Sequence, residues 1–376
     1  MNGWMDNNMI LFLADVHIGV KLDKHDMWDA LNVGLETWKR MADKHDETCD
    51  LIVVCGDLFD HALNVDEMIF ASGWISRLCR NGCGVDGGNC PVRILEGTYS
   101  HDRYQFEIFM SILNGIDGCD VRYYRTWDVE IVCGKRILYL PQQYGDVDYG
   151  DAFEHEYDLI CGHGPISSMN KNVVSGHGNE IVHSVETMGG ISRLCVFGHY
   201  HEYTDFGNGV YYAGSMLRFR YGENVDKMIC MCDNNMNMIA VKQPVAKPYV
   251  TVTVDNPDML RDMLNGDHID TPHRFIIQTN DVDELKTYRA IMNTTKHNDN
   301  IKFMVENVVD ERNDMNDDEN DNGVTPKSSL SNDGDMVVEP IVGLIDYIKT
   351  KYELDVSDEI HDYEMKIKRD TDGDKT

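Results

Sequence analysis

Basic residues are scarce in this chain. It has 34 lysines and arginines against 65 aspartates and glutamates, so its formal net charge is −31. This balance argues against a protein that grips nucleic acid through a broad basic surface of its own. It leaves open an enzyme whose acidic groups hold cations, or a chain whose partner supplies the basic surface.

Long apolar segments are also lacking. No stretch is long and apolar enough to span a membrane, and the N-terminus MNGWMDNNMI has neither the basic region nor the apolar core of a signal peptide. The 11 cysteines are odd in number and scattered, and Cys55, Cys161 and Cys195 lie inside apolar runs, as buried free thiols do. These features predict a reducing, cytoplasmic compartment and no membrane partner.

The composition predicts a folded core in an α/β protein. The chain has 376 residues, of which 42% are hydrophobic and 26% charged, and this length allows one large domain plus a smaller one. Residues 9–14 and 51–57 are apolar runs, and residues 28–44 between them carry apolar side chains at helical spacing. A sheet that opens with such a strand-helix-strand unit begins with parallel strands.

The most informative stretch is the apolar run at residues 51–57. It ends in Gly56 and Asp57, and a second carboxylate, Asp60, follows. A buried strand that delivers an acid at its carboxyl end is a common way for an open α/β sheet to build a site. A plain strand that ends in a polar turn has the same appearance, so this stretch alone does not decide between the two.

The same arrangement recurs four more times. Apolar runs at residues 9–14, 91–95, 157–161 and 194–197 each lead into a segment that contains histidine. The polar residues delivered there are Asp15, His17, Ser100, His101, Asp102, His163, His199 and His201. Carboxylates and imidazoles are the ligands that transition metals prefer, and five such strand ends in one chain are very specific for a metal site.

These residue types match the needs of a two-metal site for phosphoryl transfer. Two cations about 3.5–4 Å apart can clamp the attacking and the leaving oxygen. Asp57 is the natural carboxylate to bridge them, and the imidazoles favour Mn, Fe or Zn over Mg alone. The leaving oxygen also needs a proton donor near the metals but not bound to them. His101, with its charge or tautomer set by the adjacent Asp102, fits that role.

The ordered motifs resemble those of the calcineurin-like metallophosphoesterases. They more closely resemble the SbcD family of DNA double-strand-break repair exonucleases and their tailed-phage recombination-endonuclease counterparts. The motifs are residues 11–19 (LFLADVHIG), 56–60 (GDLFD), 198–201 (GHYH) and 211–216 (YYAGSM), with Phe219, Gly222 and Glu223 beyond them. The resemblance covers residues 9–230 well and the rest weakly. It implies a metallophosphoesterase β-sandwich flanked by helices, with a small α/β capping domain and a C-terminal helical tail.

The resemblance also implies a ligand set. One metal would be held by Asp15, His17, Asp57 and His201. The other would be held by Asp57, His163, His199 and a residue of the third motif. In that motif Ser100 stands where the family has a metal-binding asparagine, and a hydroxyl is a weaker ligand than a well-placed amide oxygen.

The implied cofactors are two divalent cations, with Mn²⁺ as the first choice and Mg²⁺, Fe²⁺ or Zn²⁺ as alternatives. Substrate contacts would come from Asp60, His61, Arg103 and Arg218. For Asp60 and His61, the alternative is that they cap the next helix.

The chain divides by composition and pattern into four segments. Residues 9–240 are predicted to form the nuclease domain, and residues 247–309 a small α/β capping domain that contacts DNA. Residues 310–339 are strongly acidic and predict a disordered linker. Residues 340–376 begin with an amphipathic helical stripe, which we interpret as a partner-binding helix in preference to one that folds back onto the chain.

The resemblance implies DNA as the substrate and an SbcC-like ATPase of the SMC family as the partner. It implies a homodimer within a heterotetramer, in a bacterial or phage-infected host cytoplasm. We therefore expect a metal-dependent DNA exonuclease or endonuclease subunit that acts in recombination, repair, replication and end processing. Two alternatives are a phosphatase or phosphodiesterase of the same fold that acts on small molecules or phosphoproteins, and a catalytically weak scaffold.

Overall fold

The computed structural model describes residues 8–20, 24–81, 89–102, 105–168, 179–265, 271–279, 281–294 and 301–306. These residues form two compact units, a larger one within residues 1–219 and 225–247 and a smaller one within residues 220–224 and 248–339. Among the described residues, no helix has the length and apolar character needed to cross a membrane. The predicted linker and helical tail, residues 310–376, lie outside the described ranges.

The first sheet of the larger unit has six strands in the order β14-β13-β1-β2-β3-β4. Four run parallel: β1 (Asn8–Leu13), β2 (Thr48–Val54), β3 (Val92–Leu95) and β4 (Val121–Tyr124). Two antiparallel strands, β13 (Met228–Cys232) and β14 (Met238–Lys242), extend the sheet beyond β1. The parallel start predicted from the strand-helix-strand pattern is thus confirmed.

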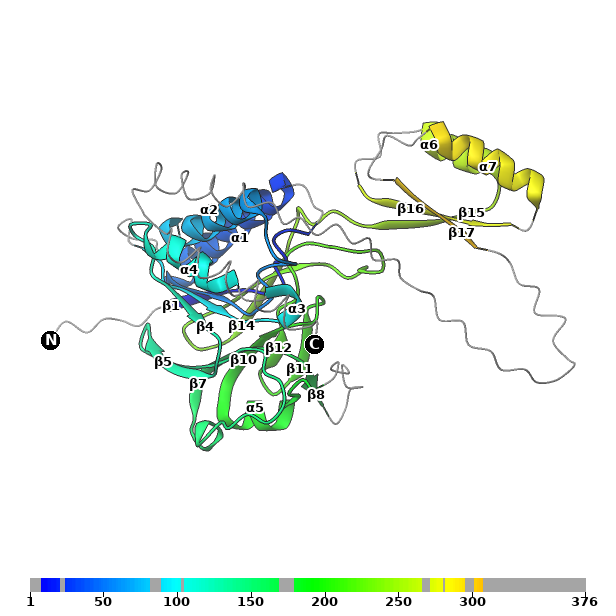
Figure 1. Ribbon diagram of the computed structural model, residues 1–376. Coiled ribbons are helices and arrows are strands. Elements are labelled where there is room, and N and C mark those ends of the chain that lie inside the picture. The colour runs from blue at the N-terminus through cyan, green and yellow to red at the C-terminus, as the bar shows by residue number, and fades with distance from the viewer. Residues whose placement is uncertain are drawn as a thin grey trace, which may run out of the picture. The chain divides into compact units, whose positions relative to one another are not determined.

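Helices connect the parallel strands, as parallel pairing requires. They are α1 (Lys24–His45), α2 (Val65–Asn81), the short α3 (Tyr99–Asp102) and α4 (Phe106–Asn114). Figure 1 shows α1, α2 and α4 on the outer face of the first sheet, where their apolar sides share one buried cluster with β1, β2 and β3.

The second sheet also has six strands, in the order β11-β12-β10-β7-β6-β5. Its parallel strands are β6 (Lys135–Leu140), β7 (Tyr157–His163), β10 (Ser192–Gly198) and β12 (Val210–Tyr212). Antiparallel strands form its edges, β5 (Asp128–Val132) and β11 (Thr204–Gly207). Four smaller elements accompany it: η2 (Ala152–Glu154), the paired strands β8 (Ile166–Ser167) and β9 (His183–Ser184), and α5 (Val185–Ile191).

The two sheets pack face to face. Buried side chains from both, including Phe12, Val53, Tyr139 and Leu159, form one apolar cluster. A separate cluster lies between the second sheet and α5. The larger unit therefore has four layers, helices, sheet, sheet and helix (Figure 1), and the mixed α/β class is confirmed.

A buried ion pair joins the two sheets at one end. Arg93 of β3 is 2% exposed, and its Nε lies 2.7 Å from a carboxylate oxygen of Glu130 on β5. A second bond runs from Nη2 to the other oxygen at 3.0 Å, and the Tyr124 hydroxyl donates to Glu130 at 2.8 Å. Two parallel bonds between a guanidinium and a carboxylate fix the geometry of both groups, so this contact holds the relative position of β3 and β5.

The smaller unit is a three-stranded parallel sheet covered by two helices. The strands are β15 (Val250–Val254), β16 (His273–Gln278) and β17 (Ile301–Glu306), in that order. The helices are α6 (Pro257–Asn265) and α7 (Val282–Thr294). Leu260 and Tyr288 of the helices share an apolar cluster with Phe275 of the central strand.

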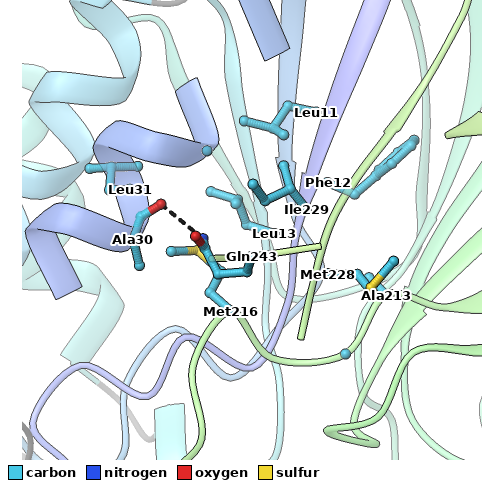
Figure 2. Close-up of a pocket in the computed structure, with 12 residues that line it drawn as sticks. Leu11, Phe12, Leu13, Ala30, Leu31, Ala213, Met216, Met228, Ile229 and Gln243 are labelled. Carbon is cyan, nitrogen blue, oxygen red and sulfur yellow. Dashed lines mark hydrogen bonds between the residues drawn. The ribbon is translucent and has the colours of Figure 1, made fainter. Parts of the chain in front are cut away.

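A small cavity remains between α1 and the first sheet (Figure 2). Apolar side chains such as Leu13, Leu31 and Met216 line it, and its volume is about 10 Å³. At its side, the Gln243 amide donates to the carbonyl of Ala30 at 3.1 Å. A space of that size holds about one water molecule at most, so it is a packing gap and not a substrate site.

The inter-sheet ion pair leads to a stability prediction. Arg93→Met keeps much of the side-chain volume but leaves the Glu130 carboxylate, whose side chain is 12% exposed, without its main cation. Breaking a buried pair in this way costs about 3–5 kcal/mol, so we expect that loss in the free energy of unfolding measured by urea denaturation.

Arg122→Met is the matched control for that variant. Arg122 lies 2.9 Å from the same carboxylate, but its side chain is 59% exposed. Exposed ion pairs contribute about 0–1 kcal/mol. Equal losses for the two variants would contradict the importance of the inter-sheet pair.

Candidate metal centre

The residues predicted from separate strand ends meet at one edge of the sandwich. The ligand atoms of Asp15, His17 and His201 lie within 4.8 Å of one another, and so do those of Asp15, Asp57 and His163. Asp15 and His17 follow β1, and Asp57 follows β2. In the second sheet, His163 ends β7 and His201 follows β10. Because Asp15 belongs to both groups, the groups are adjacent. They are buried sets of aspartate and histidine that could hold a metal ion.

Asp57 belongs to the second group and also faces the first. One of its oxygens, Oδ2, is 3.9 Å from Nε2 of His17, and the other, Oδ1, is 3.4 Å from Nε2 of His163. Burial by itself would raise the pKa of this carboxyl, but the imidazoles of His163 and His17 hold the pKa well below its usual range. Asp57 is therefore an anion with one oxygen turned toward His17 and the other toward His163.

His163 is oriented by the main chain. Its Nδ1 lies 2.7 Å from the carbonyl oxygen of Cys55; a carbonyl only accepts, so Nδ1 carries the proton and Nε2 faces Asp57. Burial by itself would lower the pKa of His163, but Asp57 raises it to about 10. A metal ligand histidine characteristically donates its second ring nitrogen to a carbonyl or carboxylate, and a cation at Nε2 would take the place of the proton there.

His17 and His201 face each other. Their Nε2 atoms are 3.1 Å apart, and Nδ1 of His17 lies 3.5 Å from a carboxylate oxygen of Asp60. The contact with His17 is the main cause that lowers the pKa of the Asp60 carboxyl. Two imidazole nitrogens that converge, one of them backed by a carboxylate, form half of a metal coordination sphere.

Asp15 supplies the clearest sign that the site suits a cation. Its Oδ1 accepts the backbone N–H of His199 at 2.8 Å, but its buried Oδ2 has no hydrogen-bond partner among the described residues. An unsatisfied buried carboxylate oxygen is costly. A divalent cation between Asp15, His17 and His201 would satisfy it, so the residues present fit a metal.

The backbone of the site is strained. Asp15, His17, Asp57 and His199 have φ values of 49°, 50°, 48° and 104°, in the left-handed region that residues with a Cβ rarely adopt. Each such residue costs on the order of 1–3 kcal/mol and persists where surrounding structure enforces it. Gly56 shows the crowding: a Cβ there would lie 2.2 Å from Nδ1 of His163, so only glycine lets β2 deliver Asp57 beside β7.

The structure gives His101 and Asp102 different partners, so the predicted pairing of these two side chains is wrong. Nδ1 of His101 donates to the carbonyl of Asp60 at 2.8 Å. The buried Asp102 carboxylate accepts the N–H groups of Phe59 at 3.0 Å and Gly97 at 2.6 Å, and burial raises its pKa. His101 still lies at the site: its ring centroid is 4.8 Å from that of His17, and with His17 and Asp60 it forms a third group that could hold a metal ion.

Two predicted ligands lie outside the metal groups just described. Ser100 is exposed on α3, in contrast to the buried Asp15 and Asp57. His199 packs edge-on against His163, with the ring centroids 5.5 Å apart, and burial lowers its pKa. The structure places both residues next to the site, on the segments that deliver His101 and His201.

The residues predicted to contact substrate have mixed outcomes. Asp60 orients His17, as described above, and His61 is half-exposed between Asp60 at 3.3 Å and Glu67 at 3.4 Å. Arg218 is 8% exposed and donates to the carbonyls of Ala246 and Val225. Its guanidinium is turned into the fold, so the prediction of a substrate contact is wrong for Arg218.

Arg103 lies outside the described residues, so its predicted contact with substrate stays a prediction.

The sequence interpretation missed Thr98. Its N–H donates to Oδ1 of Asp57 at 2.5 Å, and its hydroxyl lies 3.2 Å from Oδ2 and 3.5 Å from Nε2 of His163. A threonine after a glycine is too common in loops to be a signal, and only the approach of β3 to β2 gives it this role.

A comparison of the chain with models of known protein families found no match, and a search of curated proteins found none. The function of this site is therefore inferred from its own residues.

The buried Oδ2 of Asp15, which has no hydrogen-bond partner among the described residues, leads to a prediction on metal binding. Asp15→Asn keeps the acceptor for His199 but removes the negative charge. We expect Mn²⁺ at a hundred times its Kd to stabilise the wild type by about 2.7 kcal/mol, seen as a higher Tm. The variant should show little or no Mn²⁺ response.

Asp233→Asn is the control, because Asp233 is also a buried carboxylate that accepts backbone N–H groups, at the turn between β13 and β14. It should keep the full Mn²⁺ response. A wild-type response in Asp15→Asn would remove Asp15 from the ligand set.

Proposed function

We propose that this chain is a metal-dependent phosphodiesterase that hydrolyses DNA, with the fold of the calcineurin-like metallophosphoesterases and a closest likeness to the SbcD type. The observation that carries the proposal is the pair of adjacent ligand groups that share Asp15, with Asp57 of the second group also facing His17 of the first. Two divalent cations bound there would polarise a phosphoryl group and generate a nucleophile from water at neutral pH. Mn²⁺ is the first choice because oxygen and imidazole ligands are mixed.

The roles of the protein groups follow from their contacts. Asp15, Asp57 and the imidazoles hold the cations. Thr98 fixes both oxygens of Asp57, and Asp60 fixes the ring of His17. Such outer contacts orient the ligands before the substrate arrives, and preorganised groups need not reorganise during the reaction.

His101 is the group proposed to protonate the leaving oxygen. Its Nδ1–H is held by the Asp60 carbonyl, so Nε2 is the nitrogen that can gain and lose a proton. In hydrolysis, the bond between phosphorus and the leaving oxygen breaks while a bond to a water oxygen forms. The proton on Nε2 goes to the leaving oxygen, and solvent returns a proton to the imidazole.

Exposed aromatic rings favour a nucleic-acid substrate over a small phosphate. Tyr99 is 47% exposed and Tyr144 is 41% exposed, and the N–H of Tyr99 donates to the Tyr144 hydroxyl at 3.2 Å. Tyr99 directly follows Thr98, and Tyr200, 38% exposed, lies between His199 and His201 in the chain. Aromatic side chains next to a cleavage site are platforms on which bases stack.

The charge of the chain supports a partner that contributes to DNA binding. With a net charge of −31, the chain supplies little of the phosphate neutralisation on which nucleic-acid affinity depends. We propose an SbcC-like ATPase in that role, bound to a homodimer of this chain through residues 340–376, which lie outside the described residues.

The proposed acid leads to the test of function. The metal-loaded chain should cut linear DNA with Mn²⁺, and His101→Asn should lower that rate by a factor on the order of 10²–10⁴, the usual range for general acid–base help. Calorimetric titration should show that the variant binds Mn²⁺ as the wild type does, because His101 is proposed as the acid and not as a ligand.

His155→Asn is the control, since His155 is a half-exposed histidine that pairs with Asp151; it should leave the rate unchanged. Loss of metal together with activity in His101→Asn would make His101 a ligand. Wild-type hydrolysis of para-nitrophenyl phosphate without cleavage of DNA would favour a phosphatase. Inactivity on both substrates would favour a scaffold.

The exposed tyrosines lead to a separate prediction on substrate binding. Tyr99→Leu should raise KM for a single-stranded oligonucleotide about tenfold, because one base–aromatic stack contributes roughly 1–3 kcal/mol. KM for an abasic strand with the same number of phosphates should not change. Tyr99→Phe keeps the ring and should behave as the wild type. Equal KM increases on the two strands would contradict base stacking.

A further inference from the structure

A buried lysine lies behind the proposed metal ligand His201. Lys227 is 3% exposed, and its Nζ donates to the carbonyl oxygen of His201 at 2.8 Å and to the hydroxyl oxygen of Ser215 at 2.9 Å. A buried ammonium is costly unless its protons are bonded. The structure therefore holds this cation at a particular place, directly behind a ligand of the metal groups.

Ser215 completes the contact. It is fully buried, its backbone N–H donates to the same His201 carbonyl at 3.2 Å, and its hydroxyl donates to the carbonyl of Leu217 at 2.8 Å. The His201 carbonyl thus accepts from Lys227 and from the backbone N–H of Ser215, and the Ser215 hydroxyl also lies 3.4 Å from it. Gly214 allows this approach: its φ is +71°, and a Cβ there would lie 2.7 Å from the backbone nitrogen of Tyr203.

The contact between Lys227 and the His201 carbonyl joins the two sheets at the edge where the candidate metal ligands lie. Lys227 immediately precedes β13, which pairs with β1 in the first sheet, and β1 leads into Asp15 and His17. His201 follows β10 in the second sheet. The segment that carries His201 is therefore fixed to the sheet that carries its partner ligands, in addition to the packing of the two sheets.

We infer that Lys227, together with Ser215, positions the imidazole of His201 opposite His17 for a divalent cation. Lys227 is a positioning residue that acts through the backbone of a ligand. This inference rests on the metal site of the proposed function. The ammonium of Lys227 could also repel a cation bound nearby. The direction of the change in metal affinity on removal of the ammonium distinguishes positioning from repulsion. Loss of positioning weakens metal binding, and loss of repulsion tightens it.

The test is calorimetric titration of Mn²⁺ into metal-free protein. Lys227→Met keeps the length of the side chain and removes the ammonium. We expect its Kd for Mn²⁺ to rise about tenfold, within the range found for contacts behind metal ligands. Lys135→Met is the matched control, since Nζ of Lys135 also donates to a backbone carbonyl, that of Asn234, at 3.0 Å; its Kd should stay within about twofold of the wild type.

Each outcome bears on the inference. A lower Tm of Lys227→Met with an unchanged Kd would assign the lysine to stability alone, and a lower Kd would assign the main effect to charge repulsion. Either would overturn the inference. If Lys227→Met does not fold, Ser215→Ala removes the hydroxyl that accepts from Lys227 and donates to the carbonyl of Leu217, and an unchanged Kd in that variant would overturn the inference equally. Failure of the wild type to bind Mn²⁺ would instead refute the proposed function.

Discussion

The position of one buried carboxylate, Asp57, is the constraint on which the rest of the site depends. An anion enclosed in a protein core is stable only beside positive charge or hydrogen-bond donors. Here these are the imidazoles of His17 and His163 and the backbone N–H of Thr98. Each comes from a different strand of the sandwich, so the two sheets must be correctly placed relative to each other for Asp57 to have all these partners. Divalent cations between the same groups would meet this demand more fully than protons.

The need of the Asp57 carboxylate for these partners accounts for the unusual backbone conformation at the strand ends. The left-handed conformations at Asp15, His17 and Asp57 turn the chain sharply where each strand ends, so that side chains point across the edge of the sheet and not along it. Strain of this kind where ligands must converge is common at functional sites. The ion pair of Arg93 with Glu130 and the contact of Lys227 with His201 join the sheets, so the distance between ligands of different sheets is fixed by more than apolar packing.

The acidity of the chain has a local and a global meaning. Locally, carboxylates at the site attract divalent cations, and a bound cation displaces protons from its ligands. Globally, a net charge of −31 repels a polyanion. These two facts are compatible if bound cations and a partner supply positive charge and the exposed rings of Tyr99 and Tyr144 supply contact with bases.

The sequence by itself determined the α/β class, the parallel start of the sheet and most of the polar residues that meet at its edge. It could do so because short continuous apolar runs mark buried strands, and the polar residues at their ends meet wherever strand ends share an edge. Only the tertiary structure decided which atoms meet. His101 and Asp102 are neighbours in the chain, but successive residues of a helical turn point about 100° apart, so their partners are Asp60 and two backbone N–H groups. Thr98 and Lys227 acquire their roles from strands that are distant in sequence, and no local pattern records such a contact.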